Sequence, residues 1–189
     1  MRADARRNVD ALLQAAMTVF GTSGVDAPMR AIASAAGVGV GTLYRHFPQR
    51  SDLIKAIIQR EVDDCVEAAA SLSQVLPPGE ALAEWMSRLV DFVSIKRGLG
   101  PALHSGDPAY QSLPDYVQGQ LVPALRQLLD SASASGEVRG DVDARELLFA
   151  ALRLATPASD GGADEARRMV MLLVDGLRFR AAPSTSSLP

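Results

Sequence analysis

Side chains that can hydrogen-bond phosphate oxygens and base edges lie close together in the first third of the chain. Thr42 and Tyr44 carry hydroxyl groups that can donate to phosphate oxygens, and Arg50 adds a charge-assisted donor for the same kind of acceptor. Arg45 can bond both acceptors of a guanine, and Val40 offers an apolar surface to a thymine methyl group. We therefore expect the first three residues to position the protein on a duplex and the last two to carry sequence preference.

The residues around these side chains predict two short helices joined by a tight turn. The first helix is expected over residues 28–37, where Ala33 is small enough to let a second helix approach and Gly37 can take the positive φ that ends the helix. The second helix is expected over residues 40–47, with Leu43 as a buried anchor. This is the outline of a DNA-reading helix-turn-helix.

The stretch resembles the helix-turn-helix of the TetR/AcrR family of repressors. The resemblance rests, in order, on Ala33, Gly37, Val38, Gly41, Thr42, Leu43, Tyr44, His46, Phe47, Pro48 and Leu53. It covers about residues 5–60, and the pattern GxGTLYRHFPxR is similar to that of the subgroup called SbtR-like. Beyond that range the resemblance guides the architecture only.

The resemblance implies a role for each position of the motif. The implied phosphate contacts are Thr42, Tyr44, His46 and Arg50. The implied base contacts are Arg30, Val40, Gly41 and Arg45. Structural alternatives stay open for three of these residues, because Arg45 could be a solvated charge, Arg30 an ion-pair partner and His46 a packed or capping residue.

Two positions next to the second helix depart from the family pattern. Gly39 stands where many relatives carry Ser, and Gln49 stands where Ser or Thr would cap the helix that follows. We expect Ser51 and Asp52 to take over the electrostatic part of that cap.

Charge is distributed unevenly along the chain. The net charge is −3, yet residues 1–60 hold eight Lys or Arg against four Asp or Glu, whereas residues 61–189 hold eleven against eighteen. The positive charge therefore lies beside the motif, and attraction to phosphates depends on that local field. Arg2, Arg6 and Arg7 either reach neighbouring phosphates or the minor groove, or are only solvated.

Apolar periodicity predicts an all-α fold. Helices are expected over residues 6–22, 28–37, 40–47, 50–74, 80–96, 115–134, 141–154 and 163–180. The resemblance implies that residues 1–50 form an N-terminal three-helix, helix-turn-helix DNA-binding domain and that the helix over 50–74 connects. It also implies that residues 75–180 form a C-terminal helical ligand-binding and dimerisation domain. Residues 97–114 hold three prolines and three glycines and are expected to be rich in loops, with room for a short helix or a mobile flap. The tail 181–189 should be disordered.

Aromatic and apolar residues in the C-terminal region could line a pocket for a small molecule. The candidates are Trp85, Met86, Leu89, Phe92, Leu103, His104, Tyr110 and Tyr116. A plain hydrophobic core explains most of them equally well.

The last two expected helices carry dense apolar faces. The candidates for a dimer interface are Leu147, Leu148, Ala151, Leu154, Val170, Leu173, Val174 and Leu177. In the family this antiparallel pair meets its copy in a second subunit as a four-helix interface, and the placement implies the same here. The alternative is that both faces belong to the core of a single chain.

Other function classes find little support. Apolar residues make up 48% and charged residues 22%, and no stretch approaches the roughly 20 apolar residues of a membrane span, so no membrane partner is expected. Two histidines and the single Cys65 give no metal set, and neither a cofactor fingerprint nor a catalytic motif is present. Gln14 and Thr18 interrupt the apolar run that a secretory signal would need, so we expect a cytoplasmic protein.

The resemblance implies a homodimeric repressor that binds a palindromic double-stranded DNA operator and is released by a small-molecule effector. The sequence does not identify the effector, the operator, the target genes, or whether the output is repression or activation. A helical adaptor that has lost DNA binding is the nearest alternative, and an enzyme is a more distant one.

Overall fold

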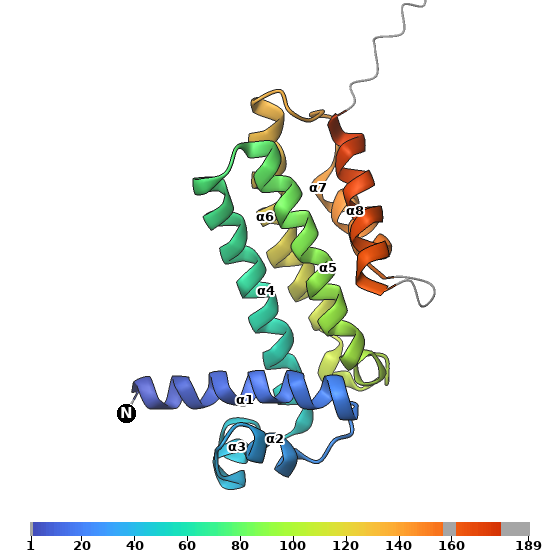
Figure 1. Cartoon of the computed structure of the whole chain (residues 1–189). Helices are drawn as coiled ribbons and strands as arrows, with labels where there is room; N and C mark the ends of the chain where they lie inside the picture. The colour runs from blue at the N-terminus through green and yellow to red at the C-terminus, as the bar shows by residue number, and fades with distance from the viewer. Residues whose placement is uncertain (1, 157–161, 179–189) are drawn as a thin grey trace, which may run out of the picture. The chain divides into compact units, whose positions relative to one another are not determined.

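The structure is a computed structural model that describes residues 2–156 and 162–178, with side chains over 7–94, 99–156 and 162–178. Within these ranges the regular structure is helical, which confirms the all-α prediction (Figure 1). The helices are α1 Arg2–Ser23, α2 Met29–Ala35, α3 Val40–His46, α4 Arg50–Val75, α5 Pro78–Leu103, the short 3-10 helix η1 Pro108–Tyr110, α6 Leu113–Ala134, α7 Ala144–Leu154 and α8 Gly162–Arg178. The predicted disordered tail, 181–189, lies outside the described residues.

By internal contacts the chain divides into two compact units. The first comprises residues 1–64 with 92–118, and the second comprises residues 65–91 with the described residues from 119 onward. The helices α4, α5 and α6 each contribute residues to both units. The helix-turn-helix belongs to the first unit, and α7 and α8 belong to the second.

A buried stripe on α1 supports the helix-turn-helix. Leu12, Ala16 and Phe20 recur at four-residue spacing and are at most 2% exposed, so they form one face of the helix. Arg60 of α4 donates to Asp10 of α1 at 2.9 Å, which adds a polar tie between the two helices.

The turn between α2 and α3 has the geometry that the sequence predicts. Gly37 has a φ of 68°, and the N–H of Val38 donates to the carbonyl of Ala33 at 3.0 Å, which satisfies a carbonyl at the end of α2. Ala33 and Leu43 are both fully buried, and α2 contacts α3. A larger side chain at position 33 would therefore push the two helices apart.

The start of α4 is capped by Asp52. The N–H of Gln49 donates to the Asp52 carboxylate at 3.1 Å, and the N–H of Asp52 donates back to the carbonyl of Gln49 at 3.1 Å. Lys55 pairs with the same carboxylate at 3.1 Å. Asp52 thus replaces the side-chain cap that Gln49 does not supply.

Helix α5 is longer than the sequence predicts. The residues expected to be loops from position 97 remain helical to Leu103, despite Pro101 inside the helix. Leu99 is 2% exposed, so burial against the rest of the chain outweighs the low helix propensity of the glycines and the proline around it. The Nδ1 atom of His104 lies 2.8 Å from the carbonyl of Gly100 and closes the end of the helix.

The core of the second unit is built around Trp85. Its ring is fully buried, and its Nε1–H donates to the carbonyl of Cys65 at 2.8 Å, so the indole has no unsatisfied donor. Cys65 itself is buried.

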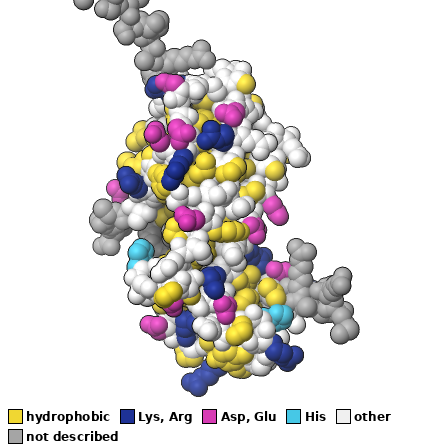
Figure 2. Space-filling view, turned by 180° about the vertical axis from the view of Figure 1, so that it is seen from behind, with side chains coloured by type: hydrophobic (Ala, Val, Ile, Leu, Met, Phe, Trp, Pro, Cys, Tyr) yellow, Lys and Arg dark blue, Asp and Glu magenta, His cyan; other side chains and the backbone are white. Residues whose placement is uncertain are grey.

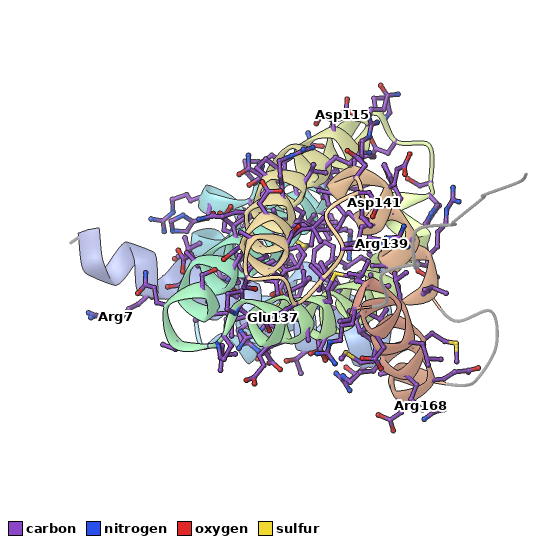
Figure 3. The ribbon with its side chains drawn as sticks, turned by 90° about the horizontal axis from the view of Figure 1, so that it is seen from above. Arg7, Asp115, Glu137, Arg139, Asp141 and Arg168 are labelled. Atoms are coloured by element: carbon purple, nitrogen blue, oxygen red, sulfur yellow. The ribbon has the colours of Figure 1, made fainter. Side chains whose placement is uncertain are left out.

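The turn between α6 and α7 fixes the end of α8. The N–H of Arg139 donates to the carbonyl of Leu177 at 2.8 Å, and the Arg139 guanidinium lies beside Asp141 with two contacts at 2.6 and 2.7 Å (Figure 3). This pairing lowers the pKa of Asp141 to about 2. Asp143 then begins α7, since its carboxylate accepts from the N–H groups of Arg145 and Glu146 at 2.9 and 3.1 Å.

No helix in the described ranges combines the length and the hydropathy that crossing a bilayer requires.

Candidate nucleic-acid interface

Helix α3 presents one face to the outside of the chain. Val40 is 42% exposed and Tyr44 is 48% exposed, although both are large hydrophobic residues, whereas Leu43 between them is fully buried. Gly41 and Arg45 are also exposed, and Thr42 is half-buried. The predicted contact residues of α3 therefore share a surface that the chain itself leaves uncovered.

Basic side chains accompany this face. Figure 2 shows Lys and Arg side chains on the lowest part of that view, where α2 and α3 lie in Figure 1. Arg30 of α2 is exposed. The side chains of Arg2 and Arg6 lie outside the described residues, and Arg7 is exposed.

Arg45 is held by its own helix. Its Nε donates to the carbonyl of Gly41 at 3.2 Å, one turn earlier in α3. A guanidinium has five N–H donors, so this contact directs the side chain along the helix while the terminal nitrogens remain available for two acceptors of a base.

His46 lies at the end of the same helix and is exposed. Its ring is tilted by 49° against Phe47, with the centroids 6.3 Å apart. It is thus neither buried nor enclosed, and it remains accessible to a phosphate.

Arg50, at the start of α4, is half-buried. Its Nη1 donates to the carbonyls of Val25 and Ala27, the second at 2.7 Å, and the guanidinium lies 6.0 Å from the centroid of the Phe20 ring. The side chain therefore holds the loop between α1 and α2 against the start of α4. Because Nη1 is directed at acceptors within the chain, we propose that Arg50 acts as an internal tie and not as the phosphate contact that the resemblance implies.

Arg50 also acts on Tyr110, which belongs to the same unit. Burial and the charge of Asp107 raise the pKa of the Tyr110 hydroxyl, and the positive charge of Arg50 opposes this shift.

The eight predicted ligand-binding residues are divided between the two units. Trp85, Met86 and Leu89 are fully buried in the second unit, while the other five belong to the first. Of those five, Phe92 and Tyr110 are buried, Leu103 and Tyr116 are half-buried and His104 is exposed.

Two of the predicted polar ligand contacts are occupied by the chain itself. The hydroxyl of Tyr116 donates to the Asp63 carboxylate at 3.0 Å, and the His104 ring bonds to the Gly100 carbonyl. A groove of about 680 Å³ lies elsewhere, on α6, and includes none of the eight residues. It is lined by Val122, Pro123, Arg126, Gln127 and Asp130.

The predicted dimer residues are mostly buried within the single chain. Six of the eight, namely Leu147, Leu148, Ala151, Val170, Val174 and Leu177, are at most 4% exposed within the single chain. The single chain itself buries these six side chains. Leu154 is 38% exposed and Leu173 is half-buried, so only these two remain accessible.

Two exposed residues on α8 were missed by the sequence analysis. Met169 is 39% exposed and Leu172 is 63% exposed. Helix α8 carries apolar residues on more than one face, and apolar type alone does not indicate which face meets the chain's own core.

Among the described residues, no group of three or more His, Cys, Asp or Glu side chains could hold a metal ion.

Family models match most of the chain. A model described as bacterial regulatory proteins of the tetR family matches residues 12–57, which hold the helix-turn-helix. A second model, described as the C-terminal domain of SbtR-like transcriptional regulators, matches residues 77–179.

Individual proteins agree with these models. A TetR transcriptional regulator of Streptomyces coelicolor has 38% identity and a TM-score of 0.77, with 92% of this chain and 99% of that chain covered. A TetR regulatory protein of Mycobacterium vanbaalenii has 34% identity and a TM-score of 0.75, with coverage of 94% and 99%.

An HTH-type transcriptional regulator of Staphylococcus aureus (strain USA300) is 44% identical over 64 residues, which are 33% of this chain and 35% of that protein. The chain thus matches about a third of the length of such curated relatives. The matches over nearly the whole chain are decisive: this chain belongs to the TetR family of DNA-binding transcriptional regulators, and its C-terminal domain is of the SbtR-like type.

Proposed function

We propose that this protein is a homodimeric repressor that binds a palindromic operator and is released from it by a small-molecule effector. The observation that carries the proposal is the exposed face of α3, where Val40 and Tyr44 remain open to solvent while Leu43 is buried. Val40 and Tyr44 lie one helical turn apart on this face, so a single partner surface can contact both.

The chemistry of this face fits the major groove of DNA. Arg45 and Arg30 bind guanine edges, and Val40 contacts a thymine methyl group. Thr42, Tyr44 and His46 hold the backbone phosphates and set the register of α3 in the groove. Arg50 supports this arrangement from within, since it holds the α1–α2 loop from which α2 and Arg30 follow.

Two copies of the chain bind two half-sites of the operator. A two-fold dimer places two recognition helices about 34 Å apart, one turn of the duplex, and the operator is palindromic for the same reason. We place the dimer contact on the exposed apolar residues of α7 and α8, namely Leu154, Met169 and Leu172, with Leu173 beside them.

The effector acts through the C-terminal domain. A small molecule that binds better to a conformation with wrongly spaced recognition helices shifts the population away from the operator-binding form. The protein acts in the cytoplasm, where the chromosome is accessible to it.

The proposal is tested by capturing genomic fragments on the full-length protein and sequencing them. We expect an enriched palindrome with half-sites one duplex turn apart, and a mobility shift with that fragment that is stronger than with a scrambled duplex of equal length. Equal binding to both duplexes, or no binding to either, would contradict the proposed function.

A further inference from the structure

Helix α8 carries more apolar residues than its contact with the core uses. Six apolar residues follow one another from Met169 to Val174, and each residue is rotated by about 100° from the one before it. The core buries one stripe of this helix, which consists of Ala166, Val170, Val174 and Leu177. Met169 and Leu172 remain 39% and 63% exposed. Apolar burial by itself therefore defines the rotation of α8 about its own axis only loosely.

Arg167 ties α8 to α5. Its Nε donates to the hydroxyl of Ser87 at 3.1 Å, and its Nη2 donates to the Asp91 carboxylate at 2.6 Å. Its Nη1 lies 3.8 Å from the carboxylate of Asp164 in α8 itself. All four residues belong to the second unit. Because a guanidinium is planar and its donors point in fixed directions, the two bonds to α5 hold one side of α8 in place.

The position of Arg167 around the helix determines what this tie does. At about 100° per residue, Arg167 lies about 60° from Val170 on one side of the buried stripe. Met169 lies about 100° from Val170 on the other side. The bonds at Arg167 therefore hold its own side of the helix toward α5 and leave the opposite apolar edge facing outward. Rotating α8 the other way would bury Met169 and expose Val174, and it would break both bonds to α5.

A second tie, at the end of α8, selects no rotation. The N–H of Arg139 donates to the carbonyl of Leu177 in the last turn of the helix at 2.8 Å. The last carbonyls of a helix have no donor within it and are spread around its axis, so the same N–H can bond another of them after a rotation. The backbone bond thus holds the end of α8, and the choice of the outward face is left to the side chain of Arg167.

We propose that Arg167 is a positioning residue whose bonds to α5 set the rotation of α8 and thereby make Met169 and Leu172 the surface that meets a second copy of the chain. The inference rests on the proposed homodimer and names what orients its contact surface. The side chains of Arg167 and Asp91 are 38% and 60% exposed, so their ion pair contributes little to stability. A polar pair can nevertheless select one arrangement among several apolar ones.

The test compares Arg167→Met with Arg178→Met in the full-length protein. Methionine keeps an unbranched side chain and a helix propensity close to that of arginine. Arg178 is the matched control, because it lies on the same helix and pairs at 3.1 Å with Asp175, which is also in α8. Asp91→Ala is a second variant that removes the tie from the α5 side and leaves the sequence of α8 unchanged.

The rotation of α8 is measured separately from the dimer by thiol labelling. Val174→Cys is added to the wild type and to each variant, because Val174 is 1% exposed and becomes accessible when α8 rotates. Cys65 is buried in the same unit and reports unfolding of that unit in the same sample. Mass spectrometry after a pulse of maleimide gives the labelling rate of each cysteine, and sedimentation velocity gives the dissociation constant of the dimer.

We expect Arg167→Met and Asp91→Ala each to weaken the dimer by about tenfold or more. In both variants the cysteine introduced at position 174 should be labelled at least about tenfold faster than in the wild type, whereas Cys65 should stay protected. Arg178→Met should match the wild type in both measurements.

Three results would overturn the inference. One is an unchanged dimer in Arg167→Met, and another is an equal loss in Arg178→Met. The third is faster labelling of Cys65 together with the introduced cysteine, which would mean that Arg167 only stabilises the fold. A wild-type protein that is monomeric at micromolar concentration would instead contradict the proposed homodimer, and the labelling rates would then show separately whether Arg167 sets the rotation of α8.

Discussion

The guanidinium of Arg50 lies among groups that belong to the chain itself: the carbonyls of Val25 and Ala27 and the ring of Phe20. Replacing Arg50 by alanine leaves two carbonyls without this donor and removes the contact with the ring. We expect Arg50→Ala to lower the free energy of unfolding by about 1.5–3 kcal/mol, measured by urea denaturation.

The salt dependence of DNA binding separates this role from a phosphate contact. Each phosphate neutralised by a cationic side chain contributes about −0.9 to the slope of log K against log salt concentration. Arg50→Ala should leave that slope unchanged when binding is measured under conditions where the variant is folded. A slope shallower by about one, with unchanged stability, would restore Arg50 as a phosphate contact.

Variants of Arg45 and Tyr44 can distinguish residues that contact bases from residues that contact phosphates. Arg45→Ala should cost about 1–3 kcal/mol of binding free energy, mainly on the selected operator, because the arginine bonds base edges. Tyr44→Phe should weaken binding to selected and scrambled duplexes by similar factors, because a phosphate contact carries no sequence information.

Titrations of both variants with the two duplexes measure the difference. Tyr44 is 48% exposed, so its loss of a hydroxyl should leave the free energy of unfolding unchanged. A loss for Arg45→Ala that is equal on both duplexes would assign this arginine to the phosphates.

At the scale of single elements, the start of α7 depends on one carboxylate. Asp143 accepts from the N–H groups of Arg145 and Glu146 and also lies 3.7 Å from Arg126. Asp143→Ala should lower the free energy of unfolding by about 1 kcal/mol, the usual cost of losing a helix cap. Asp143→Asn should retain most of the stability in chemical denaturation, since asparagine caps a helix as well as aspartate does. Equal losses for both variants would mean that the ion pair with Arg126, and not the cap, matters.

Helix starts and turns could be predicted from the sequence where local chemistry decides them. Gly37 ends α2 through its positive φ, and Asp52 caps α4 in place of Gln49. The extent of α5 could not be predicted, because the burial of Leu99 decides it against the local preference of glycine and proline. Such burial involves residues distant in the sequence.

The candidate site divides in the same way. The exposed face of α3 could be predicted from the spacing of its residues. Leu43 is the apolar residue that points inward after the turn, which leaves the other face of the helix exposed. The direction of the Arg50 side chain could not be predicted, because its acceptors at Val25 and Ala27 precede it by 25 and 23 residues, with α2 and α3 between. On α8, both Val170 and Leu172 are apolar, yet only the first is buried.

At the scale of the whole molecule, the two ends of the chain carry opposite charge. The first 60 residues have four more basic than acidic side chains, and the remaining residues have seven more acidic than basic side chains. Attraction to the phosphates is therefore confined to the part of the chain that holds α2 and α3. The acidic remainder disfavours other contacts with the duplex, which supports binding in one orientation.

Leu172 lies in the proposed contact between two copies of the chain. This side chain is 63% exposed on α8, so a charge there should not disturb the core of the chain, but it would lie in the proposed contact between two copies. We expect Leu172→Glu to sediment as a monomer at micromolar concentration with an unchanged far-UV circular dichroism spectrum. Val75→Glu is the matched control, because Val75 is 74% exposed at the end of α4 and is not part of the proposed contact, so this variant should remain dimeric.

Loss of the dimer should also weaken binding to the operator. Two linked recognition helices bind a palindrome more tightly than one helix does, by a factor of about 10² to 10⁴. Leu172→Glu should therefore bind the full operator only about as tightly as a single half-site, measured by fluorescence anisotropy with both duplexes. The Val75→Glu control should retain the preference for the full operator. If Leu172→Glu stays dimeric, the contact lies elsewhere than on the exposed residues of α8. If it becomes monomeric and still distinguishes the full operator from a half-site, symmetry does not create the affinity, and each chain must bind the duplex independently.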